Sequence, residues 1–127
     1  MLGNEYPEAS VAGEIVPDRD FYDYESKYAE TSASALHIPA RLPEAVSERV
    51  RELAVRIYQA MGCEGYARVD FFVTADEQVI ANEVNTIPGF TSISMYPKLW
   101  EATGLAYRDL LTRILELAFE RHSRRAR

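Results

Sequence analysis

The chain has 127 residues, 47% of them hydrophobic, which is the size and composition of one folded domain. Its 14 Lys and Arg against 20 Asp and Glu give a formal net charge of −6, which argues against a protein that grips nucleic acid over a broad basic face. The single cysteine, Cys63, excludes an internal disulfide. Because there is also no apolar signal core and no long apolar run, the sequence predicts a protein of the reducing cytoplasm without a membrane span.

The N-terminal part reads as strand and loop. Met1–Asn4 enters without a preceding amphipathic segment, so we expect a chain that begins partway into a fold. Residues 11–16 read as a short strand that Pro17 ends. Residues 18–34 form a loop longer than the roughly 12 to 15 residues usual in compact domains, and such loops are commonly functional or disordered. This loop is too aromatic for simple disorder and is predicted to be a lid; its aromatic residues are Phe21, Tyr22, Tyr24 and Tyr28.

Three segments show the three- and four-residue spacing of apolar side chains that predicts helices covering a sheet. The first runs from Pro43, suited to a first turn, to Met61, with Gly62 as its C-terminal cap. The others run from Pro97 to Thr103 and from Tyr107 to about Arg121. The basic residues at the C-terminus are expected to be a solvated helix end, with contact to an acidic partner as the alternative; they are Arg121, Arg124, Arg125 and Arg127.

Two β-rich runs, residues 66–74 and 78–85, are separated by three residues of a short turn, which predicts an antiparallel hairpin. Strict alternation in the second strand places Ile80 and Val84 on the apolar face, where Asn82 interrupts the pattern. Together with the helices, the hairpin predicts an α+β fold. In this fold, helices cover one face of an antiparallel sheet and a polar site occupies the other.

The polar face of the hairpin is the candidate site, and its side chains are Arg68, Asp70, Glu83 and Asn85. Two neighbouring carboxylates repel each other unless a cation lies between them, and oxygen donors of this kind suit Mg²⁺. A surface ladder of Arg–Asp and Asn–Glu pairs, worth about 0.2 to 1 kcal/mol per pair, is the structural alternative. In the turn that follows, Gly89 lets the backbone approach a ligand and offers an N–H to developing negative charge; a plain type II turn is the alternative.

These residues belong to a set of linked motifs, which are Phe21-Tyr22-Asp23-Tyr24-Glu25-Ser26-Lys27-Tyr28, Arg68-Val69-Asp70-Phe71-Phe72, Asn82-Glu83-Val84-Asn85-Thr86, Pro88-Gly89-Phe90-Thr91 and Ser92-Ile93-Ser94-Met95. In this order, from about residue 3 to residue 120, they resemble the C-terminal part of D-alanine–D-alanine ligases of the ATP-grasp superfamily. The Glu-x-Asn pair alone fits many ATP-grasp ligases. The aromatic loop and the run from Asn85 to Ser94 point to this branch.

The resemblance implies a nucleotide and metal site. Asp70, Glu83 and Asn85 would hold two Mg²⁺ ions, with Mn²⁺ as an alternative, against the phosphates of ATP, and Glu83 would bridge them. Lys27 would reach the transferred phosphate from the lid. The implied reaction transfers the γ-phosphoryl group to the carboxylate of one D-alanine, and the amine of a second D-alanine then attacks the acyl phosphate. The product, D-alanyl-D-alanine, serves peptidoglycan synthesis in the cell wall.

The resemblance also implies roles for the turn and the lid. Arg68 and the N–H of Gly89 would steady the oxyanion of the tetrahedral intermediate. Ser94 and the backbone of Met95 match the positions that take the carboxylate of the second D-alanine. Tyr28 matches the loop tyrosine that closes over the site in dipeptide-forming members, which favours D-alanyl-D-alanine as product over a depsipeptide.

The resembling enzymes contain two further domains, N-terminal and central, which supply the first D-alanine pocket, the adenine cleft and phosphate-binding lysines. Residues 1–127 therefore read as a partial ATP-grasp C-terminal domain, and we expect little or no ligase turnover from this chain alone. The alternative is an inactive remnant that serves as a metal-binding or assembly module. Apolar surface left uncovered where other domains dock predicts partner binding or a homo-oligomer.

Overall fold

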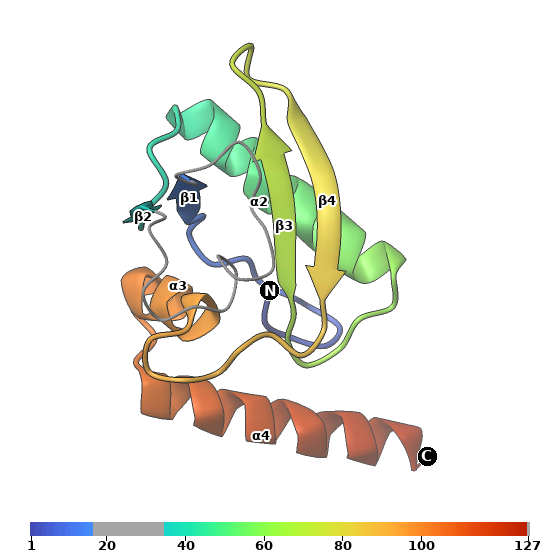
Figure 1. Cartoon of the computed structure of the whole chain (residues 1–127). Coiled ribbons are helices and arrows are strands. Elements are labelled where there is room, and N and C mark those ends of the chain that lie inside the picture. The colour runs from blue at the N-terminus through green and yellow to red at the C-terminus, as the bar shows by residue number, and fades with distance from the viewer. Residues whose placement is uncertain (17–34, 127) are drawn as a thin grey trace.

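The computed structural model of the chain describes residues 1–16 and 35–126. The predicted lid at residues 18–34, with Lys27 and Tyr28, lies outside them. The described part is an α+β fold of two antiparallel sheets and three helices, which confirms the predicted class (Figure 1). Its elements are β1 (Glu14–Val16), β2 (Ala35–His37), α2 (Glu44–Ala60), β3 (Arg68–Val73), β4 (Val79–Asn85), α3 (Met95–Thr103) and α4 (Tyr107–Arg125).

Helix α2 packs against one face of the β3–β4 hairpin (Figure 1). Its buried side chains recur every fourth residue and are Val46, Val50, Ala54 and Tyr58. The last two form an apolar cluster with Met1 and Ala67, and the inward side chains of the hairpin pack on this cluster. Pro43 occupies the N-cap with an extended ψ of 144° and so lies just before the first turn. Gly62, beyond the C-terminal end, takes a φ of 65°, which glycine adopts without strain.

A second apolar cluster lies between α3, α4 and the N-terminal segment. Its buried members are Leu2, Tyr96, Trp100, Leu110 and Leu117. Leu2 also forms isolated β-bridges with Glu8 and Tyr66, while the neighbouring Met1 belongs to the cluster under α2. The N-terminal segment therefore joins the two clusters into one packed unit.

Both C-terminal helices extend beyond their predicted bounds. α3 begins at Met95, two residues before Pro97. The helix tolerates this proline because N–H groups in the first turn have no partner within the helix, so the N–H that proline lacks is not missed. Gly104 ends this helix in the left-handed conformation, with a φ of 103°. α4 continues to Arg125. Within the described ranges, no helix is long and apolar enough to cross a membrane.

An irregularity in the hairpin changes which side chains share a face. The register shifts between Asp70 and Phe71, where Asn82 is an extra residue of β4. The part of β4 that precedes this bulge is therefore displaced by one position, and Ile80 lies opposite Phe72 on the polar face. The prediction that Ile80 joins the apolar face is wrong, because strict alternation fails at a bulge. The two side chains are 50% and 61% exposed, respectively.

Candidate active site

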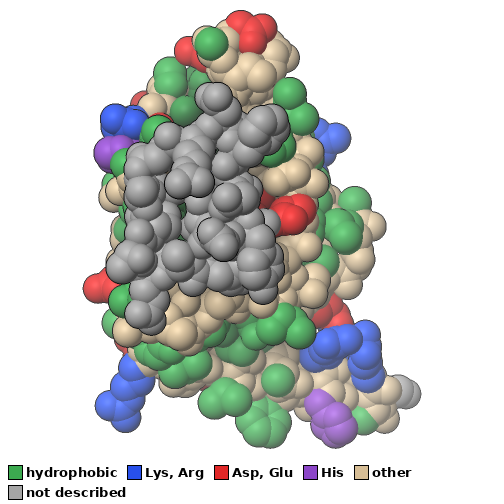
Figure 2. Space-filling view, in the orientation of Figure 1, with side chains coloured by type: hydrophobic (Ala, Val, Ile, Leu, Met, Phe, Trp, Pro, Cys, Tyr) green, Lys and Arg blue, Asp and Glu red, His purple; other side chains and the backbone are tan. Residues whose placement is uncertain are grey.

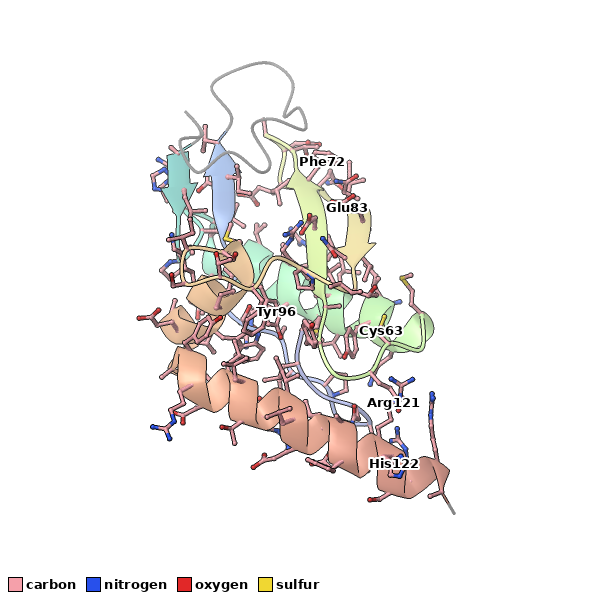
Figure 3. All side chains as sticks on the ribbon, turned by 60° about the horizontal axis from the view of Figure 1, so that its bottom comes forward. Cys63, Phe72, Glu83, Tyr96, Arg121 and His122 are labelled. Atoms are coloured by element: carbon pink, nitrogen blue, oxygen red, sulfur yellow. The ribbon has the colours of Figure 1, made fainter. Side chains whose placement is uncertain are left out.

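The polar face of the β3–β4 hairpin brings together the four side chains that the sequence singled out. Arg68 lies opposite Asn85, and Asp70 lies opposite Glu83, so the two carboxylates face the same side of the ladder. Asp70 is half-buried, and Glu83 is exposed on β4 (Figure 3). Because α2 packs on the opposite face, the two strands form a fixed support for these groups.

Arg68 lies between the two carboxylates. Its Nε and Nη2 donate hydrogen bonds to Oδ1 and Oδ2 of Asp70 at 2.8 and 3.0 Å, which is the bidentate geometry of a guanidinium on a carboxylate. Its Nη2 also lies 4.0 Å from Oε1 of Glu83. The guanidinium thus offsets the repulsion between the carboxylates. The Arg–Asp pair expected for a simple surface ladder is present, but its two residues belong to the same strand.

The donor set of this face fits a hard divalent cation. It offers two carboxylates directly opposite one another in the register, and the amide oxygen of Asn85 stands at the end of β4. That oxygen accepts the N–H of Ile87 at 3.1 Å, which orients the amide and starts the following turn. The described residues contain no group of three or more His, Cys, Asp or Glu that could hold a metal. Mg²⁺ at this face would therefore take further ligands from phosphate or water, as it commonly does.

The loop after β4 leads to three further predicted residues, Gly89, Ser94 and Met95. Asn85 and Gly89 are four residues apart, so they can be separated by at most about 14 Å. A Cβ at Gly89 would lie 3.2 Å from Oγ of Ser94, so glycine permits a close approach of the turn to the start of α3. Ser94 is the N-cap of α3, and its Oγ accepts the N–H of Thr91 at 3.0 Å. The N–H groups of a helix N-terminus favour a negatively charged group nearby.

Met95, the first residue of α3, contributes its backbone to this corner. Its side chain packs toward the segment before β1, because a Cβ at Gly13 would lie 3.2 Å from the Met95 Cε and 2.8 Å from a methyl carbon of Leu99. The Met95 side chain therefore packs against this segment, and the role predicted for Met95 concerns its main chain only.

A profile described as "D-ala D-ala ligase C-terminus" matches residues 1–116, which include the hairpin, the turn and α3. The chain belongs to this family.

Individual relatives agree with the family match. The D-alanine–D-alanine ligase of Shouchella clausii is 56% identical over 124 residues, covering 98% of this chain and 34% of the relative. The D-alanine–D-alanine ligase A of Salmonella typhimurium is 52% identical over 123 residues, covering 97% of this chain and 34% of the relative. The chain thus spans about a third of the length of the curated relatives it matches.

Solved structures show the same fold. The D-alanine–D-alanine ligase of Coxiella burnetii superposes with a TM-score of 0.84 at 42% identity and covers 98% of this chain and 32% of that one. The VanG D-Ala:D-Ser ligase of Enterococcus faecalis gives a TM-score of 0.80 at 40% identity, over 91% of this chain and 34% of that one. The fold of the D-Ala–D-Ala ligase C-terminus is therefore shared by ligases named for different second substrates.

The structure adds apolar side chains to the candidate site of this family member. The register places Phe72 and Ile80 on the same face as Asp70 and Glu83, and Figure 3 shows Phe72 farther along the hairpin than Glu83. Sequence alternation missed Ile80, although Asn82 gave a signal, because a polar residue at an apolar position is what a bulge produces. The site face therefore combines a charged end with an exposed apolar end.

The basic C-terminus of α4 has a structural role in this domain. Arg121 Nε lies 2.7 Å from Oε2 of Glu64, and Arg124 and Arg125 pair with the same carboxylate. Glu64, Arg121 and Arg125 border a cavity of about 540 Å³ between α4 and the loop before β3, which Cys63 and His122 also line (Figure 3). Glu64 thus fastens the end of α4 to the rest of the fold, so the helix end is less freely solvated than the sequence suggested.

Proposed function

We propose that the chain is the C-terminal catalytic portion of an ATP-dependent D-alanine–D-alanine ligase of the cytoplasm, whose product serves peptidoglycan synthesis. The observation that carries this proposal is the polar face of the hairpin, where Asp70 and Glu83 are directly opposed beside Arg68. Family membership and relatives named D-alanine–D-alanine ligase support it.

The residues of the hairpin suit the phosphoryl half of the reaction. Asp70, Glu83 and Asn85 would hold two Mg²⁺ ions, which would offset the charge of the ATP phosphates when bound. Lys27, outside the described residues, would reach the transferred phosphate. The fixed hairpin contributes by positioning these groups, because phosphoryl transfer depends chiefly on positioning and electrostatics.

The residues of the turn suit the second half, in which an amine attacks the acyl phosphate. Arg68 and the Gly89 N–H would stabilise the oxyanion that develops at the attacked carbonyl. The Ser94 hydroxyl and the Met95 backbone at the start of α3 would bind the carboxylate of the incoming D-alanine. Tyr28 would close over the site from the lid.

We expect turnover to require segments beyond residues 1–127, because relatives with the named activity are about three times as long. The remaining segments would provide the first D-alanine pocket, the adenine cleft and further phosphate ligands. No observation favours the alternative of an inactive metal-binding or assembly module.

A growth experiment tests the proposal in cells. The chain is joined to the other two thirds of the Shouchella clausii ligase and expressed in bacteria that lack D-alanine–D-alanine ligase and depend on supplied dipeptide. We expect growth without dipeptide, and loss of growth for the equally expressed Asp70→Asn chimera. Failure of the unmodified, soluble chimera to support growth would overturn the proposal. Growth rescue by the Asp70→Asn chimera would reject the role of the hairpin.

A further inference from the structure

One peptide unit in the loop between β4 and α3 is held at both of its polar ends. The carbonyl oxygen of Phe90 accepts a hydrogen bond from the hydroxyl of Tyr107 at 2.8 Å. The N–H of Thr91 donates to Oγ of Ser94 at 3.0 Å. Both groups belong to the same planar peptide unit, so the two bonds together fix its orientation. This unit lies two peptide units after the one that carries the Gly89 N–H.

The ring of Phe90 is held by the same tyrosine. The ring centroids of Phe90 and Tyr107 lie 5.5 Å apart with planes at 65°, and that of Tyr96 lies 5.6 Å from Phe90. Tyr107 is the first residue of α4, which is anchored by the fully buried Leu110. The loop is therefore attached to α4 through Tyr107, far along the chain from the hairpin that carries the charged groups.

Two groups of Thr91 contact the Ser94 hydroxyl. Its oxygen accepts the N–H of Thr91 and also lies 2.8 Å from the Thr91 hydroxyl oxygen. A serine hydroxyl has one proton to donate and two lone pairs that accept. When the Thr91 hydroxyl donates as well, both lone pairs of Ser94 are occupied, and its own proton is directed away from the loop. Such a hydroxyl is suited to donate to a carboxylate.

We propose that Tyr107 is a positioning residue for the acceptor amino acid. It acts through Phe90 and holds the Gly89–Ser94 turn in the arrangement that presents the Gly89 N–H and the Ser94 hydroxyl to the reactants. Its own hydroxyl donates to the Phe90 carbonyl, so its contribution is to hold the turn. The inference rests on the proposed function for the identity of the acceptor, a D-amino acid carboxylate.

The first test measures amide hydrogen exchange in the Gly89–Ser94 turn of the isolated chain. Tyr107→Phe removes the hydroxyl and keeps the ring, and Tyr6→Phe removes the same group from a side chain that is 85% exposed. We expect amide hydrogen exchange at Thr91 to accelerate roughly two- to tenfold in Tyr107→Phe, as loss of one hydrogen bond predicts, while Leu110 exchanges as before. Exchange at Thr91 equal to that of Tyr6→Phe would overturn the proposal.

The second test separates positioning from a general loss of structure. In the chimera with the remainder of the Shouchella clausii ligase, Tyr107→Phe should raise KM for the acceptor D-alanine roughly two- to tenfold and leave KM for ATP unchanged. An equal effect on both KM values, or on neither, would reject the positioning role. An inactive unmodified chimera would instead count against the proposed function, and hydrogen exchange at Thr91 would still decide whether Tyr107 holds the turn.

Discussion

The buried N-terminal amine of Met1 has a shifted pKa whose effect on stability can be measured. The N-terminal amine of Met1 donates to the carbonyl oxygen of Ala67 at 2.9 Å, and the carbonyl of Met1 accepts the hydroxyl of Tyr96. Burial lowers the pKa of this amine from its ordinary value of 8.0 to about 5, because a charged ammonium is poorly solvated there.

This shift predicts that the chain becomes less stable as the pH falls from 8 to 5. Between these values the unfolded amine binds a proton that the folded amine does not, so the free energy of unfolding rises with pH. The expected slope approaches about 1.4 kcal/mol per pH unit, or about 4 kcal/mol in total. Urea denaturation at several pH values measures it. The double variant His37→Gln/His122→Gln should keep the slope, and flat stability over this range would refute the assignment.

The hairpin carboxylates predict a cation site that can be tested without turnover. In the isolated chain, Mn²⁺ should broaden the amide resonances near Asp70 and Glu83. Asp70→Asn should weaken this effect by at least the roughly 10- to 100-fold that loss of an outer-sphere partner commonly costs. Asp76→Asn, in the turn at the far end of the hairpin, is the matched control. Equal Mn²⁺ titrations for the two variants would rule out the predicted metal ligands.

The shared face of the candidate residues was predictable because the alternation of side chains along a strand is local. Alternation places Glu83 and Asn85 on one face of β4, and the observed register places Asp70 opposite Glu83 on that face. The bidentate contact of Arg68 with Asp70 could not be predicted, since strand alternation gives the face of a side chain and not its rotamer. The role of Tyr107 was equally hidden, because its contact with Phe90 joins distant parts of the chain.

Secondary-structure elements followed the sequence where periodicity is long. Helices α2 and α4 were predicted because apolar spacing over many turns leaves little ambiguity. Strand β2, Ala35–His37, has three residues and pairs with β1 across the segment 17–34, so no local pattern reveals it. The bulge at Asn82 likewise depends on pairing between strands.

The register predicts different costs for two neighbouring phenylalanines. Phe71 packs on the cluster under α2, whereas Phe72 is 61% exposed. Phe71→Ala should lower the free energy of unfolding by about 2 to 3 kcal/mol, below the usual cost for a fully buried phenylalanine because Phe71 is only half-buried. Phe72→Ala should cost less than about 1 kcal/mol. Urea denaturation of both variants measures the difference, and equal costs would contradict the observed register.

At the scale of the whole fold, the described residues expose several large apolar side chains. On α4, Leu115 and Phe119 are 62% and 73% exposed, and Ile87 after β4 is 81% exposed. Figure 2 shows apolar side chains gathered along α4, away from the hairpin. A chain that spans a third of its relatives is expected to leave such surface uncovered.

We therefore expect the isolated chain to self-associate at high concentration. Light scattering should show an apparent mass that rises with protein concentration above that of a 14.4 kDa monomer. Replacing Leu115 and Phe119 by lysine should reduce this rise, whereas replacing Thr112 by lysine on the same helix should reduce it less. A constant monomeric mass at the highest soluble concentration would contradict the expectation.

Formation of D-alanyl-D-alanine from D-alanine, ATP and Mg²⁺ distinguishes the catalytic portion of a ligase from an inactive metal-binding or assembly module. The assay compares the purified chain with the purified chimera that carries the other two thirds of the Shouchella clausii ligase, with dipeptide detected by mass spectrometry. We predict no measurable dipeptide from the chain alone and sustained, D-alanine-dependent dipeptide formation by the chimera. A folded chimera that binds ATP and forms no dipeptide would contradict the assignment of this chain as the catalytic C-terminal portion of the ligase.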